Sequence, residues 1–150
     1  MIRMIISEPS LLLNKKLKEY TYDAIDEIDD FNYCTFDFEE TPVDEIIDAL
    51  ETPSFSSSCK VVVCKNPYFI KDEKVKMSFE NDISAFEKYL YNANPNSLLI
   101  IVCSQKYYNP KSKFVTIFSN LGKIETYGGS VEQVETIKQF IKDHDKKQLM

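Results

Sequence analysis

The sequence predicts an α/β domain whose parallel five-stranded sheet carries helices on both faces. Strand-like and helix-like patterns alternate strictly along the 150 residues, and the strand-helix unit recurs five times, which is typical of a three-layer parallel sheet. Two strand patterns, 60–64 and 97–103, are continuous β-branched or aliphatic runs, as expected of strands covered on both faces. A chain of this length can bury one proper core, so we expect one compact domain.

The other three predicted strands limit the possible strand orders. Segment 3–7 is a short apolar run, whereas 32–38 and 123–127 alternate apolar and polar residues in the manner of half-exposed edge strands. With the first, third and fourth strands buried, the orders 5-1-4-3-2 and 2-1-3-4-5 fit equally well. The first order belongs to ATPases of the RecA and AAA+ type, and the second to flavodoxin-like and receiver domains. The pattern alone does not distinguish them.

Most predicted helices begin at recognisable start signals. The helix after the first strand is predicted to open with Pro9 in its first turn, where proline is tolerated. Two later helices are predicted to begin with an N-cap residue that is followed by proline, namely Thr41 with Pro42 and Asn109 with Pro110. These signals place a helix after the first, second and fourth strands.

The two remaining helices bear on domain organisation. One is marked by three apolar residues at helical spacing, Ile83, Phe86 and Leu90. The other begins at Ser130, which forms a predicted capping box with Gln133. We therefore expect residues 1–129 to form the α/β domain and residues 130–150 to form a helix that follows it.

Composition and charge exclude several classes of function. The net charge is -6 and Arg3 is the single arginine, which argues against a nucleic-acid platform because phosphate binding depends on clustered lysine and arginine. The longest apolar run, 97–103, is too short to span a bilayer, and residues 1–6 lack the long apolar core of a signal peptide. We therefore expect a cytoplasmic protein with a protein partner and no membrane partner.

Neither a metal site nor a thiol enzyme is predicted. The four cysteines lack the paired spacing of zinc sites. Three of them, Cys34, Cys64 and Cys103, lie in apolar runs, where a free cysteine packs as a small hydrophobe. The single histidine, His144, lies in a charged terminal segment, so no nucleophile with a neighbouring base is apparent.

The loops at the carboxyl ends of the predicted strands lack the residues of a nucleotide site. A phosphate-binding loop needs glycines after the first strand, but residues 7–10 read SEPS and include the acid Glu8. The third strand ends in Cys64, Lys65 and Asn66, where a magnesium ligand or a phosphate-accepting aspartate would be needed. We therefore expect neither nucleotide hydrolysis nor a cofactor.

Residues 49–69, ALETPSFSSSCKVVVCKNPYF, are the most distinctive stretch of the chain. Together with the preceding FDFEETPVDEIIDAL and the later SLLIIVC, they resemble the amino-terminal domain of the delta subunit of the bacterial DNA polymerase III clamp loader. The shared features are an opening strand and turn, a Phe-Asp pair, a loop with threonine, proline and phenylalanine, and a valine-rich strand ending in Lys-Asn. They correspond here to 5–12, 36–37, 52–55 and 60–66.

The resemblance implies the order 5-1-4-3-2 in an AAA+-like module that has lost nucleotide binding. It also implies that the module binds the ring-shaped sliding clamp, the beta subunit, and opens it by inserting apolar residues into a pocket of the clamp. The corresponding element is 52–57, with four clamp-binding residues, Thr52, Pro53, Ser54 and Phe55. Phe55 matches the second inserted residue, and Ser54 stands where a large apolar residue is common.

The resemblance further implies a non-catalytic part of a larger protein. The family's complete polymerase is a DNA-directed DNA polymerase, but this module has no catalytic, nucleotide-binding or metal-binding residue. Family members continue into a helical lid, to which residues 130–150 would lead, and a collar that assembles with other clamp-loader subunits, so DNA is reached only indirectly. Two alternatives stay open: a flavodoxin-like small-molecule-binding or enzyme domain with an unrecognised site, and a Phe55 that folds back into the core.

Overall fold

The computed structural model describes residues 1–71 and 79–127, which form a five-stranded sheet with parallel pairing throughout. The strands follow the order β2-β3-β4-β1-β5. Their bounds are β1 Ile2–Ser7, β2 Tyr33–Asp37, β3 Lys60–Lys65, β4 Ser97–Cys103 and β5 Lys123–Tyr127. Counted from β5 this is 5-1-4-3-2, so the predicted order is confirmed. Because β1 pairs with β4 and β5, the flavodoxin-like order is wrong.

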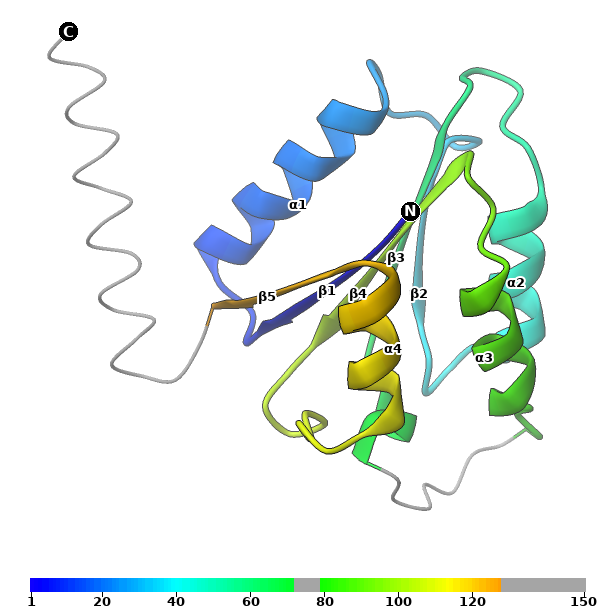
Figure 1. Cartoon of the computed structure of the whole chain (residues 1–150). Helices are drawn as coiled ribbons and strands as arrows, with labels where there is room; N and C mark the ends of the chain where they lie inside the picture. The colour runs from blue at the N-terminus through cyan, green and yellow to red at the C-terminus, as the bar shows by residue number, and fades with distance from the viewer. Residues whose placement is uncertain (72–78, 128–150) are drawn as a thin grey trace, which may run out of the picture.

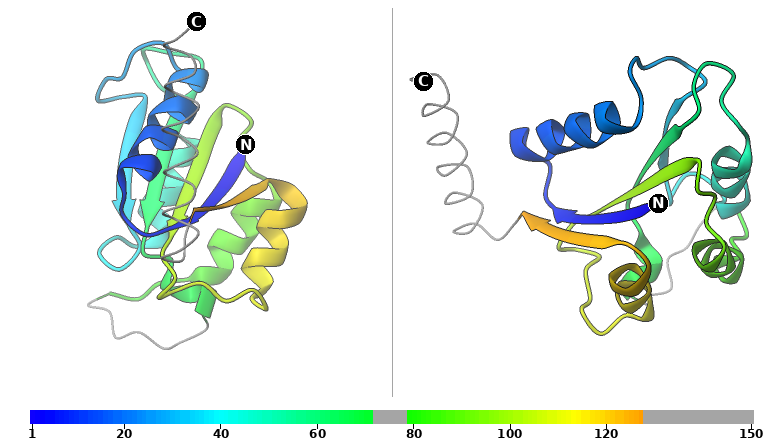
Figure 2. Two further views of the ribbon diagram at one scale, coloured as in Figure 1. Left: turned by 90° about the vertical axis from the view of Figure 1, so that its left-hand side faces the viewer. Right: turned by 45° about the horizontal axis from the view of Figure 1, so that its top comes forward.

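The described helices cover both faces of the sheet (Figure 1, Figure 2). α1 (Leu11–Ala24) lies on one face, and the other face carries α2 (Val43–Glu51), α3 (Ile83–Tyr91) and α4 (Lys113–Leu121). Side chains alternate along β1: Ile5 belongs to the core under α1, whereas its neighbours belong to the core under the other three helices. The predicted three-layer architecture is confirmed. None of the described helices is long and apolar enough to cross a membrane.

Burial separates the central strands from the edge strands, as the sequence predicts. β1, β3 and β4 are almost continuously buried, whereas no residue of β2 or β5 is fully buried. Cys64 and Cys103 are buried, and Cys34 packs against the same core. Burial raises the pKa of the Cys103 thiol to about 12 and also raises the pKa of Cys64. Both thiols therefore stay protonated, and their predicted packing role is confirmed.

A cluster of phenylalanines fills the core on the side of α3 and α4. Phe69, from the short 3-10 helix η1 (Tyr68–Lys71), meets three other rings edge on. The centroid distances are 4.9 Å to Phe38, 5.5 Å to Phe86 and 4.8 Å to Phe114. Such aromatic pairs add about 0.5–1.5 kcal/mol each to the free energy of burial. The cluster therefore holds the segment after β3 firmly against the helices.

The predicted start of α1 is wrong by two residues. The helix begins at Leu11 after the N-cap Ser10, whose hydroxyl accepts a hydrogen bond from the Leu13 N–H at 3.1 Å. Pro9 therefore precedes the helix. The serine is the better cap because its side chain satisfies an N–H of the first turn, which a proline side chain cannot do.

The predicted cap of α2 is also wrong. Pro42 is the N-cap, with a φ of -60° and a ψ of 143°, and it has no capping side chain. The Val43 N–H instead donates to Asn81 Oδ1 at 2.8 Å, across 38 residues of sequence. Thr41 belongs to the turn after β2, where its N–H donates to the Asp37 carbonyl at 2.9 Å. A tertiary contact has taken over the role expected of the threonine side chain.

The start of α4 is displaced for a local reason. Asn109 Oδ1 accepts the Lys111 N–H at 3.0 Å in a turn that includes Pro110, whereas Ser112 is the N-cap and accepts the Phe114 N–H at 3.3 Å. The asparagine thus caps the turn and not the helix. The helix predicted for 130–150, and with it the domain boundary, lies outside the described residues.

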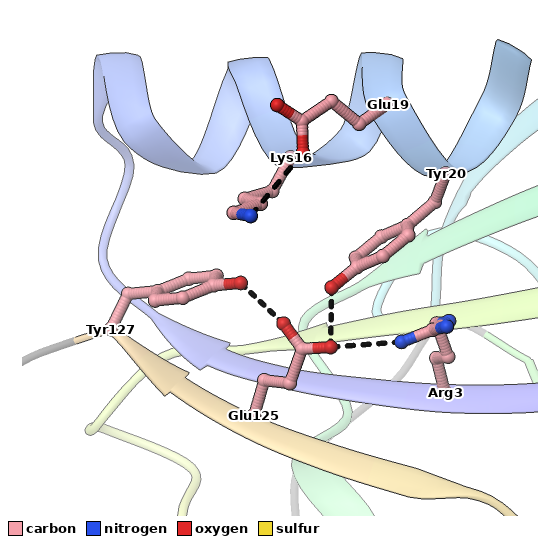
Figure 3. Close-up of polar contacts among 6 residues, drawn as sticks. All are labelled: Arg3, Lys16, Glu19, Tyr20, Glu125 and Tyr127. Carbon is pink, nitrogen blue, oxygen red and sulfur yellow. Dashed lines mark hydrogen bonds and ion pairs between the residues drawn. The ribbon is translucent and has the colours of Figure 1, made fainter. Parts of the chain in front are cut away.

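A polar cluster joins α1 to the edge formed by β1 and β5 (Figure 3). The Glu125 carboxylate accepts hydrogen bonds from the hydroxyls of Tyr20 and Tyr127, and from the Arg3 guanidinium at 2.8 Å. The guanidinium also lies 3.9 Å from the centre of the Tyr20 ring. Burial alone would raise the pKa of Glu125, but the two hydroxyl donors, Arg3 and Lys16 outweigh it and lower the pKa. The charged carboxylate therefore helps to fasten α1 to the sheet.

Candidate functional site

The loop after β1, where a nucleotide-binding module would hold phosphate, is closed by the chain's own contacts. Glu8 Oε1 accepts a hydrogen bond at 2.9 Å from the N–H of Gln105, which lies in the loop after β4. The Ser7 hydroxyl donates to the Glu8 carbonyl at 2.8 Å. Phosphate cradles need free backbone N–H groups and no nearby negative charge. This loop supplies a carboxylate instead, in line with the sequence expectation.

The end of β3 is likewise built around internal contacts. Asn66 has a left-handed φ of 56°, which asparagine tolerates better than most residues, and its amide donates to Asp37 Oδ2 at 3.0 Å. The other carboxylate oxygen of Asp37 accepts the Glu39 N–H at 2.9 Å. Within residues 1–71 and 79–127, no three His, Cys, Asp or Glu side chains gather to hold a metal ion.

The loops after β2 and β4 are tied together at the same end of the sheet. The Tyr107 hydroxyl donates a hydrogen bond to the Glu39 carboxylate. Burial, together with this bond, raises the pKa of Tyr107 to about 12, so the hydroxyl stays protonated and remains a donor. The carboxyl end of the sheet is therefore a set of loops whose polar groups bind one another.

A cleft of about 590 Å³ lies between α1 and the sheet at this end. Leu13 and Leu17 of α1 line one side, and the strands contribute Val63 and Val102. The lining residues include neither a histidine nor a cysteine, so the cleft offers neither an imidazole base nor a thiol nucleophile. Its charged lining residues are Asp37, Glu40 and Lys65, and Asp37 is already engaged with Asn66 and the Glu39 N–H.

The opposite, amino-terminal end of the sheet carries the four predicted site residues, in the loop 52–59 between α2 and β3, here called the Phe55 loop. The Thr52 N–H and hydroxyl both donate to the Asp48 carbonyl, at 2.9 and 2.6 Å. The Thr52 carbonyl accepts from Lys60 Nζ at 3.3 Å. Phe55 is 89% exposed, which excludes the alternative that its ring packs in the core.

Serine hydrogen bonds shape the Phe55 loop around its aromatic residue. Ser54 Oγ accepts the Ser56 N–H at 3.2 Å and lies 3.1 Å from the Ser56 hydroxyl oxygen. The Ser57 hydroxyl donates to the Cys59 carbonyl at 2.6 Å. Ser54 is half-buried, so its side chain turns back onto the loop. Phe55 is therefore the one large apolar side chain that this loop exposes.

A second exposed ring, which the sequence pattern did not single out, lies against Phe55. Phe31, in the loop between α1 and β2, is 55% exposed, and the two ring centroids are 5.7 Å apart in an edge-to-face contact. Neighbouring Ile28 is also exposed. The sequence did carry a signal for this exposure. Phe31 directly follows the acids Asp29 and Asp30, so it stands in polar surroundings, just as Phe55 stands among serines. Exposed apolar groups with a polar rim are typical of protein-interaction sites.

The strand order defines the fold as an AAA+-like α/β module, in which the loop after β1 presents the Glu8 carboxylate where such modules hold phosphate. Residues 7–126 match the model of the family described as DNA polymerase III, delta subunit. The chain therefore belongs to the DNA polymerase III delta subunit family.

A sequence comparison and a structure comparison, both with Bacillus subtilis delta protein, illustrate the match. The DNA polymerase III subunit delta of strain 168 is 30% identical over 110 residues, which are 73% of this chain and 32% of the relative. The solved structure of the Bacillus subtilis DNA clamp loader delta protein matches with a TM-score of 0.72 and 26% identity, over 83% of this chain and 37% of that protein. This chain thus spans well under half the length of the relatives it matches.

Proposed function

We propose that this chain binds the sliding clamp, the beta subunit, through the Phe55 loop and helps to open it during DNA replication. The observation that carries the proposal is the 89% exposure of Phe55. A large aromatic side chain that a hydrogen-bonded loop holds in water gains most free energy when a partner covers it. Phe55 would enter an apolar pocket of the clamp, with Thr52 and Pro53 at the rim.

The expected energy of this contact rests mainly on one side chain. Full burial of a phenylalanine contributes about 1.5–3 kcal/mol, and a central aromatic hot spot costs about 2 kcal/mol or more when it is truncated. Ser54 would add little, because its hydroxyl is engaged with Ser56. Within the Phe55 loop, most of the binding energy is therefore assigned to Phe55.

The module would open the clamp mechanically and would not catalyse a reaction. Two features support a non-catalytic role: Glu8 occupies the phosphate loop, and the end of β3 binds Asp37 instead of presenting a free acid. The relatives are much longer than this chain. In our proposal the complete protein is cytoplasmic and assembles with the other clamp-loader subunits. It contacts DNA only indirectly, and residues 130–150 lead toward its lid.

Titration of the full chain with the sliding clamp of the same organism tests the proposal. Phe55→Ala should weaken binding about thirtyfold, which corresponds to about 2 kcal/mol. Leu11→Ala is the matched control: Leu11 is 87% exposed and begins α1 at the carboxyl end of the sheet, so binding should not change. Both variants should keep their free energy of unfolding within about 0.5 kcal/mol of the parent. A Phe55→Ala variant that binds as tightly as the parent would refute the proposal.

A further inference from the structure

Internal hydrogen bonds shape the Phe31 loop, residues 27–32, and join it to β3. Asp29 Oδ1 accepts the N–H groups of Phe31 and Asn32 at 2.7 and 2.9 Å, and the Asn32 side-chain oxygen accepts the Asp29 N–H at 2.9 Å. The Asn32 carbonyl accepts the Val61 N–H of β3 at 2.8 Å. These bonds fasten the loop to the sheet, and the Phe31 ring projects from it into solvent.

The connections α1–β2 and α2–β3, which contain the Phe31 loop and the Phe55 loop, lie at the same end of the sheet (Figure 1). Two side-chain contacts join the two loops. The first is the edge-to-face contact of the two exposed rings. The second is electrostatic, because the Ser56 side chain lies close enough to the Asp29 carboxylate to lower the pKa of Asp29. The rings therefore belong to one surface that two separate segments of the chain build together.

We propose that Phe31 is a second anchor for the sliding clamp and forms one continuous aromatic surface with Phe55; this inference rests on the proposed function. The Phe55 loop exposes a single large apolar side chain, because the residue before Phe55 is the polar Ser54, which bonds to Ser56. Phe31 supplies the second from the neighbouring loop. Aromatic side chains that touch and are both half or more exposed lose water together when one partner covers them.

The charge around Phe31 indicates the chemistry of the surface that it meets. Asp26, Glu27 and Asp30 are exposed beside it, whereas the Phe55 loop between Thr52 and Cys59 carries no charged side chain. The matching region of the clamp is therefore apolar where it receives the two rings, and it is basic along the rim that faces the Phe31 loop. Binding should accordingly weaken as ionic strength rises.

A double-mutant cycle on the full chain tests the inference. Phe31→Ala is expected to weaken clamp binding about tenfold. Because the two rings touch, the double variant Phe31→Ala/Phe55→Ala should lose less affinity than the product of the two single effects. Phe31→Leu keeps an apolar side chain and should retain most of the affinity. Tyr22→Ala is the aromatic control, since Tyr22 is 52% exposed but lies on α1, outside the two loops, and it should bind like the parent.

The outcomes separate this inference from the proposed function. If Phe55→Ala weakens binding and Phe31→Ala does not, Phe31 is not an anchor, although the Phe55 loop still is one. Equal losses in Phe31→Ala and Tyr22→Ala would also overturn the inference, because the effect would not be specific to the aromatic surface. Urea unfolding midpoints that match the parent show that a loss of affinity does not come from loss of the fold.

Discussion

The two ends of the sheet differ in what they leave exposed to a partner. At the carboxyl end, Glu8 binds the loop after β4 and Asn66 binds Asp37, so polar groups that could hold a ligand are engaged within the chain. At the amino end the loop backbones are also hydrogen-bonded, but the rings of Phe31 and Phe55 remain in water. At the first end the loops bind one another beside the cleft under α1, and the second end offers an exposed pair of aromatic rings.

This difference shows why function has to be argued from the site and not from the fold. Parallel α/β sheets bind their ligands beyond the carboxyl ends of the strands, and the strand order here is that of nucleotide-binding modules. The hydrogen bonds among the carboxyl-end loops argue against nucleotide binding at that end. The exposed rings lie at the amino end, in connections that nucleotide chemistry does not need and that can therefore serve another partner.

The largest change in the free energy of unfolding is expected when an aromatic ring is removed from the core and not from the surface. Phe38 is fully buried, with ring centroids 4.9 Å from Phe69 and 5.4 Å from Phe86. Phe38→Ala should lower the free energy of unfolding by about 3–5 kcal/mol, whereas Phe55→Ala should change it by less than about 0.5 kcal/mol. Urea denaturation of both variants measures the contrast. Similar losses at the two positions would show that Phe55 is structural.

A smaller, pH-dependent effect is expected at the Glu125 cluster. The pKa of Glu125 is lowered in the folded chain, so its contribution is complete above its ordinary value of 4.5 and is lost as the pH falls through the lower folded value. Glu125→Gln should therefore be less stable than the parent at pH 6, and the difference should shrink toward pH 3. Urea unfolding at several pH values measures this. A difference that does not vary with pH would rule out the charged carboxylate as the cause.

The smallest expected effect concerns the carboxyl end. Millimolar ATP with magnesium should leave the melting temperature unchanged, because a ligand must bind the folded state to stabilise it and Glu8 occupies the phosphate loop. Differential scanning fluorimetry with and without nucleotide measures this. A reproducible rise of several degrees would mean that the carboxyl end still binds nucleotide, and the contrast between the two ends would fail.

The alternation of strand and helix patterns was enough to predict the sheet and its edge strands. A strand buried on one face alternates apolar and polar residues, whereas a strand buried on both faces is continuously apolar. Periodicity does not say which strand lies beside which, so it could not predict the strand order. The family resemblance predicted that order. The resemblance also led us to expect an exposed Phe55, although the sequence left a core position open as an alternative. The 89% exposure of Phe55 distinguishes the two.

The features that the sequence did not reveal depend on contacts between distant residues. The start of α2 is set by Asn81, which lies 38 residues from Val43. The outward direction of Phe31 depends on the Asp29–Asn32 turn and on the bond from Asn32 to β3. No propensity of a single residue encodes such partners, so both features needed the structure.

Hydrogen–deuterium exchange with and without the sliding clamp tests the central claim most directly, namely that the amino end of the sheet is the face that meets the partner. Backbone amides that an interface covers exchange more slowly. The account predicts slower exchange in residues 27–32 and 52–59 when the clamp binds, and unchanged exchange in the carboxyl-end loops 7–10 and 104–108. Protection of the carboxyl-end loops, with both aromatic loops unchanged, would contradict it.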